Sequence, residues 1–158
     1  GDIESLPYIE ALRQFRYELG ASNCLVLHLT LIPYLAAAKE LKTKPTQHSV
    51  KLLLESGVQP DVLVCRTEHR LSKEIKAKLG LFCNVTNDSV IEAIDADSIY
   101  EVPLLLKREE LDLVVLRKLN LPANQTPELK DWKSFLNPLK NPLDEVRIGL
   151  AEIGRAHV

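Results

Sequence analysis

Lysine, threonine and glutamine side chains gather in the run KTKPTQHS at residues 42–49. Pro45 is typical of the first turn of a helix, because the N–H that proline lacks has no helical partner there. Apolar residues at 50, 53 and 54 then follow helical spacing as far as Gly57. The lysines are therefore predicted at a helix N-terminus, where backbone N–H groups favour an anion. This combination predicts a polyphosphate site; a solvated basic turn before an ordinary helix is the commoner alternative.

Elements able to position this run are predicted along the first 120 residues, where strand-like and helical patterns alternate. Apolar runs typical of strands are predicted at residues 24–32, 61–65, 81–85 and 98–102. Helical spacing is predicted at residues 5–19, 45–57, 72–79, 90–94 and 104–119. Strands that alternate with helices favour an α/β fold with a mostly parallel sheet.

The first helix and the first strand carry further expectations. The helix at 5–19 has an apolar stripe that predicts its packing face, made of Tyr8, Leu12, Phe15 and Leu19. The strand at 24–32 is nearly continuously apolar, which predicts burial on both faces. His28 interrupts this strand, either as part of a site or, more commonly, as a core histidine with a backbone partner.

The composition argues against several classes of function. A net charge of −2 over 158 residues argues against a broad nucleic-acid-binding surface, and no apolar run approaches the length of a membrane span. Cys24, Cys65 and Cys83 lie in apolar runs without CxxC spacing, and are predicted to be buried free thiols in a reducing compartment. The four histidines lack metal-ligand spacing, so no metal site is assigned.

Residues 121–145 differ in character from the alternating region. Four of the nine prolines surround one short helix, for which Thr126 is the predicted cap and Pro127 the first residue. One face of this helix carries Leu129, Trp132 and Leu136. The pattern predicts an interdomain linker that leads into a new strand at residues 146–150.

The sequence resembles the synthetase (amidoligase) domain of the CTP synthase family in several segments and in the right order. These segments are GDIESLPYIEALRQ, HLTLIPYLAAAKELKTKPTQHSVKLLLESGVQPDVLVCR, LFCNV and DSIY. The resemblance covers residues 1–120 and favours the C-terminal part of that domain. It implies a P-loop-like, Rossmann-type three-layer fold, present as a partial domain. Residues 121–145 would be the linker, 146–151 the truncated start of a class I glutamine amidotransferase domain, and 152–158 a non-native tail.

The family makes CTP from UTP, ATP and ammonia in de novo pyrimidine biosynthesis. ATP phosphorylates O4 of the uracil ring, and ammonia derived from glutamine displaces the phosphate. The resemblance therefore implies a ligase that binds UTP, CTP and ATP, with Mg²⁺ as cofactor, GTP as allosteric activator and CTP as feedback inhibitor. It also implies a cytoplasmic homotetramer whose pyrimidine triphosphate site is built across subunits, with no nucleic-acid or membrane partner.

Matched positions carry the family's site residues onto this chain. The resemblance implies that UTP and CTP contact the acidic loop, the KTKPTQ run and one later lysine: Asp2, Ile3, Glu4, Lys42, Thr43, Lys44, Pro45, Thr46, Gln47 and Lys78. Glu10 and Arg13 match positions tied to CTP feedback. Ile94, Asp95 and Ala96 match the positions that hold the adenine of ATP in the family. Ile94 and Ala96 would contact the adenine mainly through backbone groups.

Some features of the family are not found in this sequence. No GxxxxGK run occurs, so the phosphate loop and the Mg²⁺ ligands are expected upstream of Gly1, and the chain alone is expected to form no CTP. The glutaminase triad is expected beyond residue 158, so none of the three cysteines is its nucleophile. Residues 152–158, EIGRAHV, leave the family pattern and match a translated sequencing-library adapter.

Two other functions stay open from the sequence. One is a non-catalytic module for pyrimidine-nucleotide binding or assembly, which keeps the nucleotide site without a phosphate loop. The coding sequence upstream of Gly1 distinguishes it from the enzyme, because the enzyme needs a Gly-rich loop with a lysine. The other is a different P-loop-type amidoligase, similar to dethiobiotin synthetase, which would share the fold but lack KTKPTQ.

Overall fold

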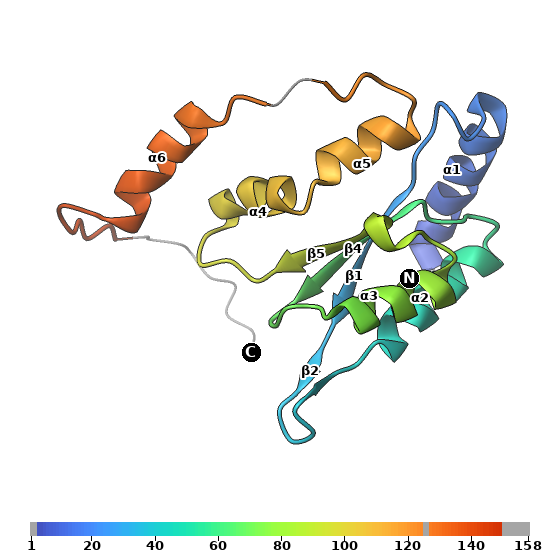
Figure 1. Cartoon of the computed structure of the whole chain (residues 1–158), viewed down its shortest axis with the longest axis horizontal. Coiled ribbons are helices and arrows are strands. Elements are labelled where there is room, and N and C mark those ends of the chain that lie inside the picture. Colours follow the sequence, from blue (N-terminus) through green and yellow to red (C-terminus); the bar gives the residue numbers. More distant parts are fainter. Residues whose placement is uncertain (1–2, 125–126, 150–158) are drawn as a thin grey trace, which may run out of the picture. The chain divides into compact units, whose positions relative to one another are not determined.

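A parallel sheet of three strands, in the order β1-β4-β5, organises the larger part of the chain (Figure 1). The strands are β1 (Leu27–Ile32), β4 (Val62–Thr67) and β5 (Val90–Ile94). The computed structural model describes residues 3–124 and 127–149. Contacts divide the chain into two units, Gly1–Gln125 and Thr126–Val158.

Helices connect the strands of the first unit. In chain order the remaining elements are η1 (Ile3–Ser5), α1 (Leu6–Leu19), β2 (Tyr34–Leu35), β3 (Glu40–Leu41), α2 (Lys44–Glu55), α3 (Lys73–Cys83), η2 (Asn87–Ser89), η3 (Ile99–Glu101), α4 (Val102–Arg108) and α5 (Leu111–Lys118). The antiparallel pair β2–β3, which the sequence did not predict, extends beyond the carboxyl end of β1. The chain then enters α2, so the start of this helix follows the carboxyl edge of the sheet.

Two apolar clusters fill the space between the sheet and its helices. On one face, α2 and α3 pack over Ile32, Val50, Leu63, Cys65, Leu71, Leu79, Cys83 and Val90. On the other face, α4 and α5 pack over Val62, Val64, Ile91 and Val114. β4 lies between its two neighbours and is buried on both faces. The predicted α/β fold with a parallel sheet is therefore confirmed.

Two predictions about burial were wrong. The apolar stripe of α1 faces outward, and Tyr8 is 78% and Phe15 60% exposed; the half-buried face carries Ile9, Arg13 and Arg16 instead. β1 is an edge strand rather than a strand buried on both faces, and Leu29 on it is 70% exposed. The reason is that, among the described strands, β1 pairs with β4 alone, while α4 packs on β5 at the far side of the sheet.

Three short segments adopt a different structure from the predicted one. Residues 81–85 were predicted as a strand, but residues 81–83 continue α3 and Asn84 caps it, because Leu79 and Cys83 are one helical turn apart and both are buried in the core. Residues 90–94, predicted as a helix, form β5, since burial against β4 suits their β-branched side chains. Residues 98–102, predicted as a strand, form η3 and open α4, where the Ser98 hydroxyl accepts the N–H of Tyr100.

The predicted helix at 104–119 is interrupted. Glu110 has φ 58°, a left-handed conformation that separates α4 from α5. The preceding residue, Glu109, turns inward, where its carboxylate accepts hydrogen bonds from Lys76 Nζ at 2.6 Å and from the N–H of Glu92 at 3.2 Å. Within the described residues, each helix is too short or too polar to cross a bilayer.

The second unit contains one helix, α6 (Lys130–Lys140), among its described residues. It begins three residues later than predicted, after Leu129, and Thr126 lies outside the described residues. Trp132 and Phe135 lie close together on it, with ring centroids 5.7 Å apart. Residues 146–149 form no strand, contrary to the prediction, and residues 150–158 lie outside the described range.

Candidate functional site

One face of α2, from Lys44 to Leu54, lines a cavity of about 570 Å³ between α2 and α3. Lys44 and Gln47 of the predicted run contribute to it, together with His48, Lys51 and Leu54 of the same helix and Phe82 of α3. Lys44 stands at the first position of α2, where unpaired backbone N–H groups add to its positive charge. This cavity is suited to a multiply charged anion with an adjacent flat group.

The other residues of the KTKPTQ run have structural roles. Thr46 is fully buried; its hydroxyl hydrogen-bonds that of Thr30 at 2.8 Å and donates to the Leu31 carbonyl at 3.2 Å. Thr43 is 5% exposed, and its hydroxyl oxygen accepts a bond from Gln47 Nε2. Pro45 occupies the first turn of the helix. These three residues hold the N-terminus of α2 against the sheet. The sequence pattern did not distinguish residues with this structural role from residues that contact a ligand.

Lys42 stands just before this helix and pairs with Glu40 of β3. Lys42 lies two residues before Lys44 in the predicted polyphosphate-binding run. Its ammonium group is already paired with the Glu40 carboxylate. A phosphate at this position would have to compete with that carboxylate. Of the two lysines, only Lys44 lines the cavity.

Lys78, the last predicted nucleotide contact, is an exposed residue of α3. Phe82 follows it by four residues and so shares its helix face. Phe82 lines the cavity and is 58% exposed. Phe82, His48 and Lys51 were not predicted as site residues. The i, i+4 spacing of Phe82 from Lys78 and of His48 from Lys44 was the sequence signal for the first two.

Ile3, in the predicted acidic loop, lies on a different side of α2 from Lys44. Asp2 is outside the described residues, while Ile3 and Glu4 are exposed in η1. Ile3 borders a different cavity, which meets α2 through Ser49 and Leu52 rather than through Lys44. Among the cavities lined by described residues, Ile3 and Lys44 therefore border different ones.

Glu10 and Arg13 form an ion pair on the surface of α1. Arg13 donates from Nε and Nη2 to the carboxylate at 2.8 and 2.7 Å, and Gln14 adds a third hydrogen bond. The bonds from Arg13, and next that from Gln14, lower the pKa of Glu10 to about 2. Gly57 permits a close approach by Arg13, since a Cβ added there would lie 2.8 Å from Arg13 Cδ.

The predicted adenine-binding residues border an apolar cavity of about 560 Å³ at the carboxyl ends of β4 and β5. Ile94, Asp95 and Ala96 line it, and its walls come from the sheet, η3 and α4. Arg66 lies at the same cavity and donates from Nε to Asp95 Oδ1 at 2.9 Å. An apolar cavity with one polar edge suits a flat heteroaromatic ring.

Two of the three cysteines are buried free thiols. Burial raises the pKa of the Cys65 thiol to about 12, which keeps it protonated and unreactive. Cys83 is also buried, whereas Cys24 is only half-buried, contrary to its prediction. Across residues 3–124 and 127–149, no three side chains of the metal-ligating types gather as a cation site would require.

A parallel sheet with helices on both faces, and with a cavity at the carboxyl edge, defines a Rossmann-like α/β domain of the ligand-binding kind. Residues 1–121 match the family described as "CTP synthase N-terminus". The chain belongs to the CTP synthase family.

Similar curated proteins include CTP synthases from several bacteria. The one from Cytophaga hutchinsonii is 65% identical over 150 residues, which are 95% of this chain and 28% of the relative. The one from Flavobacterium johnsoniae is 63% identical over the same shares, and that from Chloroherpeton thalassium is 56% identical over 98% of this chain and 27% of the relative. The chain thus spans less than a third of these relatives.

The family match corrects one expectation. The sequence was expected to represent the C-terminal part of the synthetase domain, and this is wrong, because the matched region is the N-terminus of CTP synthase. The motifs quoted above identify the family, but they do not fix where the matched region lies within it.

Proposed function

We propose that this chain is part of a glutamine-hydrolysing ligase that converts UTP to CTP. In this reaction ATP phosphorylates O4 of uracil, and ammonia from glutamine then displaces the phosphate. The proposal is supported by the family membership and by relatives named CTP synthase. The single observation that carries it is the cavity beside Lys44 and Gln47, two residues of the run that the family resemblance matches to UTP binding.

The second cavity is proposed as the adenine site of ATP. Leu106, Ile99 and Ala93 give it apolar walls, and the backbone of residues 94–96 borders it. The backbone N–H and C=O groups of these residues would hydrogen-bond to the edge of the adenine ring, because the Ile94 and Ala96 side chains have no polar atoms. The proposed adenine site lies at the carboxyl edge of the sheet, where ligands of open α/β sheets bind.

The pyrimidine site is proposed to form between copies of the chain. Ile3 and Lys44 border separate cavities in one copy. If the acidic loop contacts UTP, it must then do so beside the Lys44 cavity of a second copy. Lys78 and Phe82 on α3 would complete that site, together with Lys42 once its bond to Glu40 is broken. This arrangement accords with the homotetramer that the family resemblance implies.

Other proposed properties follow from the family. They are GTP activation, CTP feedback through Glu10 and Arg13, a cytoplasmic location, a linker over residues 121–145 and the start of a glutamine amidotransferase domain at 146–151. When bound, Mg²⁺ would neutralise charge on the ATP phosphates. The described residues gather no cation site of their own, so no role is assigned to them in holding it.

A chimera tests the proposal. This chain replaces the matching 150 residues of the Cytophaga hutchinsonii enzyme, to which it is 65% identical. The chimera is expected to form CTP from UTP, ATP and glutamine. Lys44→Ala and Lys42→Ala should each raise the UTP KM by about tenfold or more, because each removes a cation beside the triphosphate.

Lys39→Ala is the matched control, since Lys39 is an exposed lysine of the β2–β3 turn and lines none of the described cavities. It should leave the UTP KM unchanged. An assembled chimera that forms no CTP contradicts the proposal. If the chimera binds UTP and CTP without turnover, the non-catalytic module becomes the better description.

A further inference from the structure

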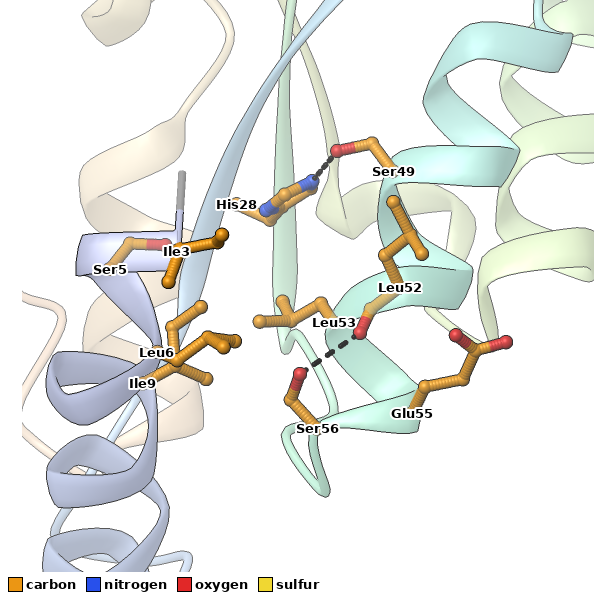
Figure 2. A pocket seen from close by; sticks show the side chains of 10 residues that line it. All are labelled: Ile3, Ser5, Leu6, Ile9, His28, Ser49, Leu52, Leu53, Glu55 and Ser56. Carbon is orange, nitrogen blue, oxygen red and sulfur yellow. Dashed lines mark hydrogen bonds between the residues drawn. The ribbon is translucent and has the colours of Figure 1, made fainter. Parts of the chain in front are cut away.

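A third cavity, of about 390 Å³, lies between α1 and α2 (Figure 2). Ile3, Leu6 and Ile9 form one wall, from η1 and α1. The opposite wall is on α2 and carries Leu52 and Leu53. His28 of β1 and Ser49 of α2 close the space between the two walls.

This cavity is separate from the proposed ATP and phosphate sites. His28 pairs with Leu63 in the sheet, near the amino ends of β1 and β4. Lys44 and Ile94, by contrast, lie at the carboxyl edge and line other cavities. Ile3 is the one residue shared with the predicted UTP contacts, so the experiment below includes UTP as a competitor.

His28 supplies an open hydrogen-bonding atom. Its Nε2 lies 2.9 Å from Ser49 Oγ, a side-chain partner where a backbone partner had been the commoner expectation. Within the described residues, no hydrogen bond is formed at His28 Nδ1. Burial lowers the pKa of His28, so the ring is neutral at pH 7. When Nε2–H donates to Ser49, Nδ1 is left as an acceptor.

The lining selects against anions. Among the described residues that line the cavity there is no lysine or arginine, and Glu55 is the only charged one. Glu55 is exposed and lies 3.9 Å from Lys51 Nζ. A phosphate or carboxylate would therefore lose its hydration without gaining a cationic partner. The aliphatic walls favour an apolar body instead.

We propose that this cavity binds an uncharged heteroaromatic molecule of one or two rings, which packs between Leu6 and Leu53 and donates a ring N–H to His28 Nδ1. This inference does not depend on the proposed function. It assigns the chain a site distinct from those for UTP and ATP, in contact with both α1 and α2.

Occupancy of the site should tighten the attachment of α1. No residue of this helix is buried, so it has little apolar contact with the sheet to stabilise it. A ring between Leu6 and Leu53 would add such contact on both sides. The amides of α1 should then exchange more slowly with solvent when the cavity is filled.

Indole is the probe, because it has two rings and one N–H donor. The 158-residue chain, labelled with ¹⁵N, is titrated with indole while the imidazole resonances of His28 and the hydrogen exchange of α1 are recorded. Saturable shifts at His28 and slower exchange in α1 are expected. N-methylindole keeps the ring but lacks the donor, so it should bind about threefold more weakly or worse.

Three variants test whether indole binds in this cavity. Leu52→Trp fills the cavity and should weaken indole binding by about tenfold or more. Leu81→Trp is the matched control, since Leu81 is an exposed leucine of α3 outside the cavity, and it should bind indole normally. His28→Leu removes the acceptor and should make the affinities for indole and N-methylindole equal. Circular dichroism confirms that each variant is folded.

Several results would overturn the inference. Indole that causes no saturable shift at His28, or that binds Leu52→Trp and wild type equally, shows that this cavity is not the site. Displacement of indole by UTP or CTP assigns the cavity to the nucleotide site rather than to a separate ligand. These outcomes are distinct from failure of the chimera to form CTP, which concerns only the proposed function.

Discussion

Arg16 and Asp61 join α1 to the start of β4 by a two-pronged ion pair. Arg16 donates from Nη1 to Oδ2 at 2.5 Å and from Nη2 to Oδ1 at 3.0 Å. Asp61 also accepts the N–H of Val26 at 2.8 Å, so one carboxylate links the helix to the entries of two neighbouring strands. Because α1 has no buried residue, this pair is a main determinant of where the helix lies.

Arg16→Met should loosen α1. Both side chains of the pair are less than a quarter exposed, at 18% and 24%, so losing the bonds should cost about 1–3 kcal/mol of local stability. Hydrogen exchange is expected to speed up in the amides of α1 but not in those of α3. Lys51→Met, which removes a surface pair at 3.9 Å, is the control and should change little.

The contribution of Asp61 should depend on pH. Burial raises its pKa, but the bonds from Arg16 and Val26 outweigh this, so the pKa lies below the ordinary value. The stabilisation is then fully present above the ordinary Asp pKa, about 4, and is lost as the pH falls towards the folded-state pKa. The difference in free energy of unfolding between wild type and Asp61→Asn should shrink from pH 7 to pH 3. A constant difference would contradict this.

Glu92 should be needed for the loop after β4. Its side chain is buried, and its carboxylate accepts the N–H of Leu71 at 2.5 Å, with Arg70 Nη1 at 3.5 Å. Glu92→Ala leaves the buried N–H of Leu71 unpaired and should cost about 1–3 kcal/mol in urea unfolding. Glu68→Ala, at an exposed position in the same loop, should stay within about 0.5 kcal/mol of wild type.

Glu10→Lys tests the proposed role of α1 in feedback. The substitution breaks the Arg13 pair on the exposed face without touching the core. In the chimera it should raise the CTP inhibition constant by about tenfold while changing UTP turnover much less. Glu18→Lys introduces the same charge change at another exposed position of α1. Equal inhibition constants for wild type and Glu10→Lys would show that this face does not respond to CTP.

Ala96→Leu tests the proposed adenine site. The larger side chain would occupy part of the cavity at the ends of β4 and β5, so the ATP KM of the chimera should rise by about tenfold, with the UTP KM much less affected. Ala37→Leu, in the exposed β2–β3 turn, is the control. An unchanged ATP KM in Ala96→Leu would remove the adenine assignment.

The sequence by itself determined the family, the α/β alternation and the helix that starts at Lys44. These depend on local signals: a proline at the helix start, a glycine after its end, and apolar spacing within one element. β4 was also predictable, because a central strand buried on both faces is a continuous apolar run.

Only the tertiary structure decided which faces are buried. The stripe from Tyr8 to Leu19 has core spacing yet faces outward, because Arg16 is held by Asp61, 45 residues away in sequence. Residues 81–83 remain helical because Cys83 completes the core begun by Leu79. Thr46 became a buried structural residue through Thr30, whereas Lys44 stayed open to the cavity. Such choices depend on partners distant in sequence, which local spacing does not encode.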